Sequence, residues 1–521
     1  MITQPHKKPV VTTILLGIAC LIACVIGIIP IYFNKFPLTT PDAGGLACAA
    51  DTLAKTHQFT GYRTTTMNFA ICWTKQTYPA VQYFNAILLR FIALPSWQLV
   101  PIATLLMYLG CVISMFFIGK ILTKSNWYGC ITAILASASP ALLRPLILTP
   151  QNVYGYFLML ILLLIFSIAS TKNARWWLLT IPIAGLLAFT HTLSFGIAVF
   201  VFVPWFILFF LDAWLWRIVL ILLPAMAVYF NEQYHFLPVT IKEAWSLFNS
   251  SYSGYDHPLW DHPAIWGYII TALAAVGIAL STKLHYKIKS LLIMLIVVPV
   301  LLGHLSFIGI QLLPERFVPF TWIGLVIFAG IGLANIQEQL RLPKTLWVTI
   351  LIVLASAQIT HAVVFIKDDV DGWSARFRPH PEFIEAVQWL NTQPDKGALL
   401  GIMAVSNREI SFAPLWYDGM IENYPWYNLD HKNIKNFQAN SSLYKPILAD
   451  PTNSEYQRIK TLFTLINTPN DPSLPTALTG YNLTYFILPK TSQAYKIWQK
   501  ERSVPFDLIY ENEKYIIYAL K

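Results

Sequence analysis

Apolar segments almost free of charged residues recur along this chain, and most are long enough to cross a hydrocarbon core of about 30 Å. Only 12% of the 521 residues are charged, about half the share found in soluble globular proteins. The pattern predicts a polytopic α-helical membrane protein with about 11 transmembrane helices. The expected spans are Val10–Phe33, Trp97–Gly119, Asn126–Leu143, Gln151–Ser170, Trp176–Thr190, Leu193–Leu211, Trp216–Phe230, Ala264–Ser281, Ser290–Ile310, Phe317–Ala334 and Thr345–Ile366.

Positive charge is divided unequally between the two sides of this arrangement. Lys7 and Lys8 precede the first span, which is too long for a signal-peptide core, so we expect it to remain uncleaved with its N-terminus in the cytoplasm. Ten Lys and Arg residues fall in the inner loops and three (Arg144, Lys242 and Arg316) in the short outer loops, as the positive-inside rule requires. Helix orientation therefore accounts for the net charge of +10 without a nucleic-acid partner. We take the membrane to be a bacterial cytoplasmic (inner) membrane.

Three long polar stretches all fall on the outer side in this topology. They are residues 34–96, 231–263 and 367–521. Residues 1–366 are predicted to form the transmembrane domain, with a large first outer loop at 34–96 in which Leu46–His57 and Tyr78–Leu94 are surface helices. Residues 367–521 are predicted to form an extracytoplasmic (periplasmic) α/β domain. Its expected elements are a helix at Pro381–Asn391, strands at Ala398–Val405 and Leu483–Leu488, and a hairpin of Phe506–Tyr510 and Tyr515–Ala519.

The six cysteines separate into two groups. Cys20, Cys24, Cys111 and Cys130 lie in apolar runs and are predicted to be inert. Cys48 and Cys72 lie in the first outer loop, where disulfides persist, so we hypothesise that these two pair.

Asp42 is the first candidate catalytic residue. It stands in Pro41-Asp42-Ala43-Gly44-Gly45, shortly after the first span. The glycines let the backbone pass close to another group, and a carboxylate there could act as a general base. The alternative is a structural role, in which Asp42 begins a turn or caps the following helix.

Arg316 is the second candidate, at the outer start of the tenth span. A guanidinium at this depth could bind a lipid-borne phosphate bidentately, or it could only extend towards lipid head groups. Glu315 beside it fits a polar site or a favourable charge at a helix N-terminus.

His191 is the third candidate, because an ionisable group between two short spans is a candidate for function by default. The alternative is a turn histidine bonded to backbone carbonyls. Asp261-His262-Pro263 and the similar Asp256-His257-Pro258 contain metal-ligand residue types, but their spacing matches no standard metal cluster.

The whole layout resembles the GT-C superfamily of membrane glycosyltransferases, which take sugars from polyprenyl-phosphate carriers and include O-mannosyltransferases, aminoarabinose transferases and oligosaccharyltransferases. An early acid in a large outer loop, many spans and an outer α/β domain carry the resemblance. It implies that Asp42 is the catalytic base or a metal ligand. Pro314-Glu315-Arg316-Phe317 looks like the donor-phosphate arginine of the family, with His191 as a further donor-phosphate residue.

Two shorter matches are similar to oligosaccharyltransferase motifs. Thr240-Ile241-Lys242-Glu243 is similar to the acceptor motif TIxE, and Trp416-Tyr417-Asp418-Gly419 departs from the motif WWDYG in residue order. By this resemblance Glu243, Glu315 and Asp51 could contribute to acceptor or metal binding. Asp42 lacks a second acid two residues on, so dependence on a divalent metal (Mg²⁺ or Mn²⁺) stays open.

The function that these features predict is an inverting sugar transfer, of the hexosyl- or pentosyltransferase class, at the outer membrane face. The donor would be a polyprenyl-phosphate-linked sugar and the acceptor a lipid, a glycan or a protein. Two alternatives come from other classes of protein. One is a transporter or flippase of a lipid-linked or small solute, for which we find no internal repeat. The other is a catalytically inactive GT-C-like protein of envelope assembly.

Overall fold

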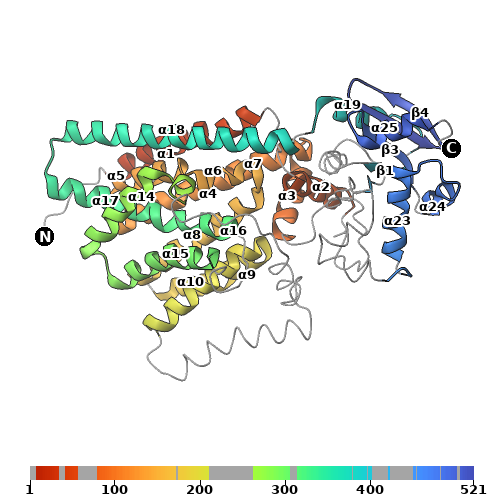
Figure 1. Cartoon of the computed structure of the whole chain (residues 1–521). Helices are drawn as coiled ribbons and strands as arrows, with labels where there is room; N and C mark the ends of the chain where they lie inside the picture. The colour runs from red at the N-terminus through yellow and green to blue at the C-terminus, as the bar shows by residue number, and fades with distance from the viewer. Residues whose placement is uncertain are drawn as a thin grey trace. The chain divides into compact units, whose positions relative to one another are not determined.

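The chain of this computed structural model divides into two units (Figure 1). The first comprises Met1–Pro37, Thr77–Val81 and Pro101–Asp371, and the second comprises Leu38–Gln76, Gln82–Val100 and Gly372–Lys521. The second unit thus includes parts of the first outer loop that we assigned to the transmembrane domain. The structure describes residues 8–34, 41–56, 79–171, 174–210, 262–304, 314–377, 379–395, 397–401, 421–422, 450–452, 454–480, 483–501 and 505–521.

The first unit is a bundle of helices. Its elements are α1 (Lys8–Asn34), α4 (Ser96–Thr123, from residue 101), α5 (Asn126–Ser137), α6 (Pro140–Leu143), α7 (Pro145–Leu148), α8 (Pro150–Thr171), η1 (Ala174–Leu179), α9 (Thr180–Thr190), α10 (Thr192–Phe210), α13 (His262–Trp266), α14 (Tyr268–Leu280), η3 (Ser281–Lys283), α15 (Tyr286–Gly303), α16 (Pro314–Phe317), η5 (Val318–Thr321), α17 (Trp322–Leu340) and α18 (Lys344–Phe377). The last segment of the second unit begins within α18, at Gly372.

Ten of the predicted spans overlap helices, and the predicted span Trp216–Phe230 lies outside the described residues. The expectation of one span over Asn126–Leu143 is wrong. There α5 ends at Ser137 and α6 begins at Pro140, because proline cannot continue a helix but suits its first position. Six described helices are long and apolar enough to cross a membrane: Val10–Ile29, Ser96–Thr123, Pro150–Ala169, Tyr286–Gly303, Val318–Leu340 and Lys344–Asp368. The total of about 11 spans stays a prediction.

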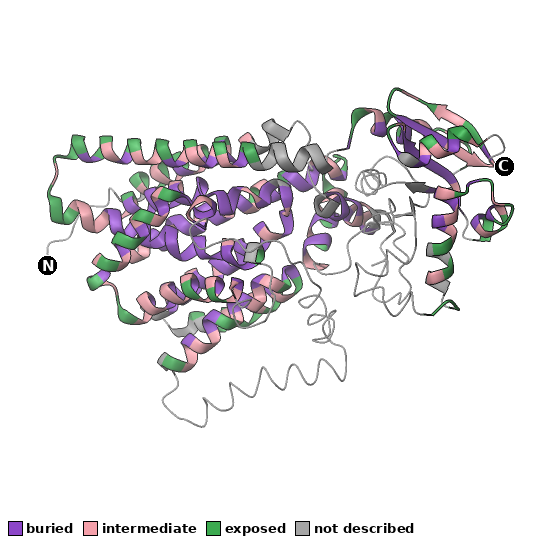
Figure 2. Cartoon of the chain, viewed as in Figure 1, coloured by how far each residue is buried: buried purple, intermediate pink, exposed green. Residues whose placement is uncertain are grey.

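Helix α17 forms the core of the first unit. Figure 2 shows it buried along most of its length, from Trp322 to Leu333, whereas most residues of α1 and α18 are exposed or half-buried. It packs against α14, α5 and α15. Gly277 of α14 and Gly332 of α17 allow close approach, because a Cβ at Gly277 would lie 1.9 Å from the Phe328 carbonyl oxygen. Small residues at such crossings are the usual device for packing membrane helices.

Short helices connect the long ones where α6, α13 and η5 meet. Each of α6, α7 and α8 begins with a proline, and α13 contacts both α6 and η5. Trp266 Nε1 donates to the Val318 carbonyl at 3.0 Å. From α18, Gln358 Nε2 donates to the Ala138 carbonyl at 2.9 Å, and His361 Nε2 donates to the Ala264 carbonyl at 3.0 Å. These bonds satisfy backbone carbonyls at helix breaks, which hydrocarbon could not do.

The second unit contains a mixed five-stranded sheet with the order β2-β1-β3-β5-β4. Its elements are α2 (Pro41–Thr56), α3 (Pro79–Phe91), α19 (Pro381–Asn391), β1 (Ala398–Gly401), β2 (Ile421–Glu422), α23 (Ser454–Asn467), α24 (Leu474–Gly480), β3 (Leu483–Pro489), α25 (Gln493–Lys500), β4 (Phe506–Glu511) and β5 (Tyr515–Leu520). Only the part of α3 from residue 82 onward belongs to this unit. Strands β1, β2 and β3 are parallel, whereas β5 is antiparallel to β3 and β4. The predicted helix at Pro381–Asn391 and the closing hairpin are confirmed.

Both faces of the sheet are covered, so the central strand β3 is apolar on both sides. On one face Phe486 and Leu488 pack with Trp498 of α25 and with residues of α23 and α24. On the other face Tyr485 and Ile487 pack with α19. The arrangement is a three-layer α/β sandwich around one sheet.

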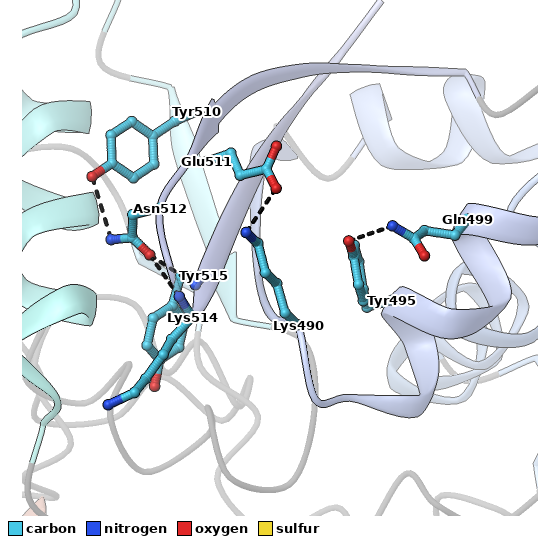
Figure 3. A network of polar contacts seen from close by, with 8 residues as sticks. All are labelled: Lys490, Tyr495, Gln499, Tyr510, Glu511, Asn512, Lys514 and Tyr515. Carbon is cyan, nitrogen blue, oxygen red and sulfur yellow. Dashed lines mark hydrogen bonds and ion pairs between the residues drawn. The ribbon is translucent and has the colours of Figure 1, made fainter.

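The turn between β4 and β5 is held by Asn512 (Figure 3). The Asn512 Oδ1 atom accepts from the backbone N–H of Lys514 at 3.1 Å and of Tyr515 at 2.8 Å. Its Nδ2 donates to the Glu382 carbonyl at 2.7 Å, and Lys514 Nζ lies 2.9 Å from Glu382 Oε1. The hairpin turn is thereby tied to the first turn of α19.

Candidate functional site

His191 lies at the break between α9 and α10. Its backbone is extended (φ −156°, ψ 99°), so the helix ends there, and a new helix begins at Thr192. The side chain is 2% exposed. The sequence placed His191 between two short spans, and the structure adds that the ring is buried among helices.

Ser194 and Gly155 surround the imidazole of His191. The Nδ1 atom lies 2.6 Å from Ser194 Oγ and 3.2 Å from the Ser194 backbone nitrogen, which donates to it. From α8, Gly155 faces both side chains, because a Cβ there would lie 2.3 Å from Ser194 Oγ and 3.0 Å from His191 Nδ1. The ring is therefore held in one orientation.

Arg316 lies in α16 with an exposed side chain. The next element, η5, places the Phe320 ring parallel to His191, with centroids 6.5 Å apart and an interplanar angle of 16°. Phe320 follows Arg316 by four residues, so the packing of η5 brings this segment of the chain to His191, which is 125 residues before Arg316 in the sequence.

An aromatic wall continues from Phe320, and sequence reasoning missed it. Tyr156 meets Phe320 edge to face at 4.8 Å and Trp322 at 5.8 Å. All three rings are buried, and inside apolar runs they look like ordinary core residues. Arg144, at the junction of α6 and α7, is half-buried. We treated Arg144 only as an orienting charge, although its position between two prolines marked a break in the helix.

A second pair of histidines lies in the first unit. His262 is 1% exposed, and its ring lies 4.9 Å from that of His304. His304 Nδ1 donates to the Val300 carbonyl at 2.7 Å. The sequence singled out His262 but gave no signal for His304 beyond an ionisable residue at the end of an apolar run. Within the described ranges no three His, Cys, Asp or Glu side chains come together in a way that could hold a metal ion.

The remaining predicted site residues are placed only in part. Asp42 is the second residue of α2, which begins earlier than the predicted Leu46, and the structure does not describe its side chain. Asp51 is half-buried further along α2. Glu315 lies in α16 with its side chain undescribed, and Glu243 lies outside the described residues. Asp42 belongs to the second unit, so its convergence with His191 and Arg316 stays a prediction.

The disulfide hypothesis also stays a prediction. Cys48 is buried in α2, and Cys72 lies outside the described residues. The four cysteines of the apolar runs, Cys20, Cys24, Cys111 and Cys130, are free thiols.

The described part of this site has the chemistry of an anion-binding site. The exposed guanidinium of Arg316 offers a charged, forked hydrogen-bond donor. The aromatic wall limits access of water from one side and strengthens electrostatic interactions there.

No protein-family model matches the sequence, and no curated protein matches it either. Solved structures do match. ArnT from Cupriavidus metallidurans is 11% identical over 97% of this chain and 97% of its own, with a TM-score of 0.60. The archaeal oligosaccharyltransferase AglB from Archaeoglobus fulgidus is 10% identical over 95% of this chain and 72% of its own, with a TM-score of 0.58. The arabinofuranosyltransferase AftD from Mycobacteria has a TM-score of 0.57 at 12% identity, but the match spans only 40% of that chain.

These neighbours are GT-C glycosyltransferases, and the chain has their fold. It is a multi-pass membrane protein with GT-C architecture. The resemblance drawn from the sequence is thereby confirmed at the level of the fold.

Proposed function

We propose that this protein is an inverting glycosyltransferase that moves a sugar from a polyprenyl-phosphate-linked donor to an acceptor at the outer face of a bacterial inner membrane. The observation that carries the proposal is the packing of Phe320, four residues after the exposed Arg316, against His191 and Tyr156. Arg316 and the aromatic rings suit a phosphate that is carried on an apolar chain, because a hydrogen-bond donor for the phosphate and apolar surface for the chain lie next to each other.

The structural neighbours support the same kind of substrate. AglB was solved in complex with an inhibitory peptide and a dolichol-phosphate. The match to ArnT extends over nearly all of both chains. A lipid phosphate as donor carrier and a separate acceptor are therefore the substrate classes that we carry over to this chain.

The mechanism that we propose gives each residue one task. Asp42 removes the proton from the acceptor hydroxyl or amine as that atom attacks the anomeric carbon of the sugar. The bond from the anomeric carbon to the phosphate oxygen breaks on the opposite side, which inverts the configuration. Arg316 stabilises the negative charge that grows on the leaving phosphate. Residues 367–521 would select the acceptor from the periplasmic side.

A metal ion has no assigned step in this mechanism. Dependence on Mg²⁺ or Mn²⁺ stays open, because the side chains of Asp42, Glu243 and Glu315 are not among those that the structure describes. Glu243, Glu315 and Asp51 would contribute to acceptor or metal binding.

The test is to incubate the purified protein in lipid with a radiolabelled polyprenyl-phosphate sugar and membrane-extracted acceptors. We expect label transfer, which Asp42→Asn abolishes while donor binding is retained. Arg316→Lys keeps the charge but loses the forked geometry, so donor binding should weaken by about 10-fold. The matched control is Asp507→Asn, which should behave as the wild type. Asp507 is an exposed carboxylate in β4 that pairs with Lys521. Normal transfer by Asp42→Asn would refute the role of this residue, and movement of the lipid without transfer would point to a flippase.

A further inference from the structure

The helix α3 reverses the polarity that is usual for a helix on a protein surface. Gln82 is 4% exposed and Asn85 is fully buried, so both of its amide side chains face the protein. Tyr83, Ile87 and Phe91 are 48%, 52% and 82% exposed. A helix that meets water on one side normally turns its polar residues to that side and buries its apolar ones. The exposed side of α3 therefore suits an apolar medium better than water.

The three exposed residues form one line, which we call the α3 ridge (Tyr83, Ile87 and Phe91). They are four residues apart, and such residues lie one above the other along a helix. Arg90 is the only charged residue of α3, and it is exposed next to the end of this ridge. A guanidinium in this place can reach lipid phosphates while its apolar stem lies along the hydrocarbon. The exposed side of α3 thus offers one group for acyl chains and one for head groups.

The connection of α3 to the next helix favours lipid as the partner. A turn of four residues, Ile92–Pro95, joins α3 to the span α4, and all four are exposed. The backbone N–H of Leu94 donates to the Ile92 carbonyl at 2.8 Å, so the turn is compact. Further along α4, Ile102 and Leu106 are 46% and 56% exposed, as is expected of residues that face hydrocarbon. Exposed apolar side chains therefore continue along the chain from α3 into a membrane span.

We propose that the α3 ridge inserts into the outer leaflet of the bilayer and anchors the second unit to the membrane. The partner is the lipid itself, with acyl chains around the ridge and phosphate head groups at Arg90. Interfacial helices bury their apolar side by about 5–10 Å at the boundary between head groups and acyl chains. Most of α3 belongs to the second unit, which also contains α2, so the anchor holds the unit that carries Asp42.

This inference goes further than the surface helix that the sequence predicts at Tyr78–Leu94. It names the side of the helix that meets the lipid, and it gives that side a task. It needs the membrane placement of the chain but not the proposed sugar transfer, so a failure of either leaves the other standing.

Spin labels distinguish lipid from water around the ridge. A ketone-bearing amino acid in place of Ile87 or Phe91 in the full-length protein takes a nitroxide without reaction at the native cysteines. In liposomes of phosphatidylethanolamine and phosphatidylglycerol, saturation measurements with oxygen report contact with lipid, and those with a nickel chelate report contact with water. Leu508 in β4 is the matched control position, because it is an apolar residue of nearly the same exposure (51%) in the sheet of the second unit.

The expected pattern is opposite at the two places. Labels at Ile87 and Phe91 should be reached by oxygen and not by nickel, whereas a label at Leu508 should be reached by nickel. Equal nickel accessibility at all three positions would place the ridge in water and overturn the proposal. Low accessibility to both reagents at the ridge would also overturn it, because protein would then cover the ridge. Spin–spin broadening that disappears on dilution with unlabelled protein would identify that cover as a second copy of the chain.

Polar substitutions test the anchoring itself. The double variant of Ile87→Gln and Phe91→Gln removes the apolar contact without adding charge, and glutamine favours helices at least as well as isoleucine and phenylalanine. Both side chains are largely exposed, so the fold should be retained. Hydrogen exchange of the α3 backbone amides in liposomes, measured by mass spectrometry, should become severalfold faster in this variant and stay unchanged in Leu508→Gln. Unchanged exchange in the double variant would show that the leaflet does not hold α3 and would overturn the anchoring.

Discussion

Substitution of Gly277 by alanine tests the packing of α14 on α17. The added Cβ would lie 1.9 Å from the Phe328 carbonyl oxygen and 3.1 Å from the Gly332 nitrogen. Both obstacles are backbone atoms at the centre of the first unit, so no side chain can rotate away. Ordinary contact begins at 3.4 Å, and the two helices must therefore separate by about 1.5 Å (3.4 − 1.9) at this crossing.

The size of the effect follows from two opposing terms. Overpacking of a tight interior costs about 1–3 kcal/mol, and the upper end applies because the obstacle is backbone. Alanine recovers up to about 1 kcal/mol through its higher helix propensity. The net loss of about 2 kcal/mol should lower the melting temperature of the full-length protein in lipid nanodiscs by about 3 to 6 °C.

Two further variants make the test specific. Gly185→Ala in α9 meets nothing within 4 Å and should leave the melting temperature unchanged or slightly raised. Gly332→Ala places a Cβ 2.6 Å from the Leu273 carbonyl at the same crossing. Because one separation of the helices relieves both clashes, the double variant should lose less than the sum of the single losses. A Gly277→Ala protein as stable as wild type, or full additivity with Gly332→Ala, would refute the close crossing.

Three other predictions concern the second unit. The hydrogen bond from Lys514 lowers the pKa of Glu382, so this contact stabilises the fold above the ordinary carboxyl range, and its contribution is lost as pH falls through the lowered pKa. Glu382→Gln should remove less than about 1 kcal/mol at pH 7 and progressively less at lower pH, as measured by thermal unfolding. If Cys48 and Cys72 pair, neither should be alkylated before reduction, and mass spectrometry of peptides that contain them will show this. The Trp498 ring stacks on that of Phe506, with centroids 4.7 Å apart, and its Nε1–H donates to the Leu465 carbonyl. Trp498→Ala should therefore lower the free energy of unfolding by about 3–5 kcal/mol and make the second unit more sensitive to limited proteolysis. A cleavage rate equal to that of the wild type would contradict this.

The sequence predicted the long helices well because hydrocarbon imposes one solution on the backbone. Without water, every N–H and C=O must bond within its own helix, so apolar runs such as Pro150–Ala169 become helices. The same reasoning failed at Asn126–Leu143, where we gave too little weight to Pro140, which interrupts the apolar run and begins a new helix.

The candidate site was predicted only as far as its ionisable groups. His191 and Arg316 stood out because charge and titratable rings are rare near a membrane. Gly155, Ser194 and Phe320 did not, since small and aromatic residues occur throughout apolar helices. Their meeting with His191 depends on how α8 and η5 pack, and no local pattern encodes it.

The unequal exposure of Arg316 and His191 has a consequence for how the site responds to its surroundings. Arg316 is exposed, so dissolved ions would screen its attraction for a phosphate over a Debye length of about 8 Å at physiological ionic strength. His191 is buried, so its contact with Ser194 would change little with salt. If Arg316 binds the carrier phosphate, as we propose, a high salt concentration would slow the capture of carriers more than it would alter the geometry around His191.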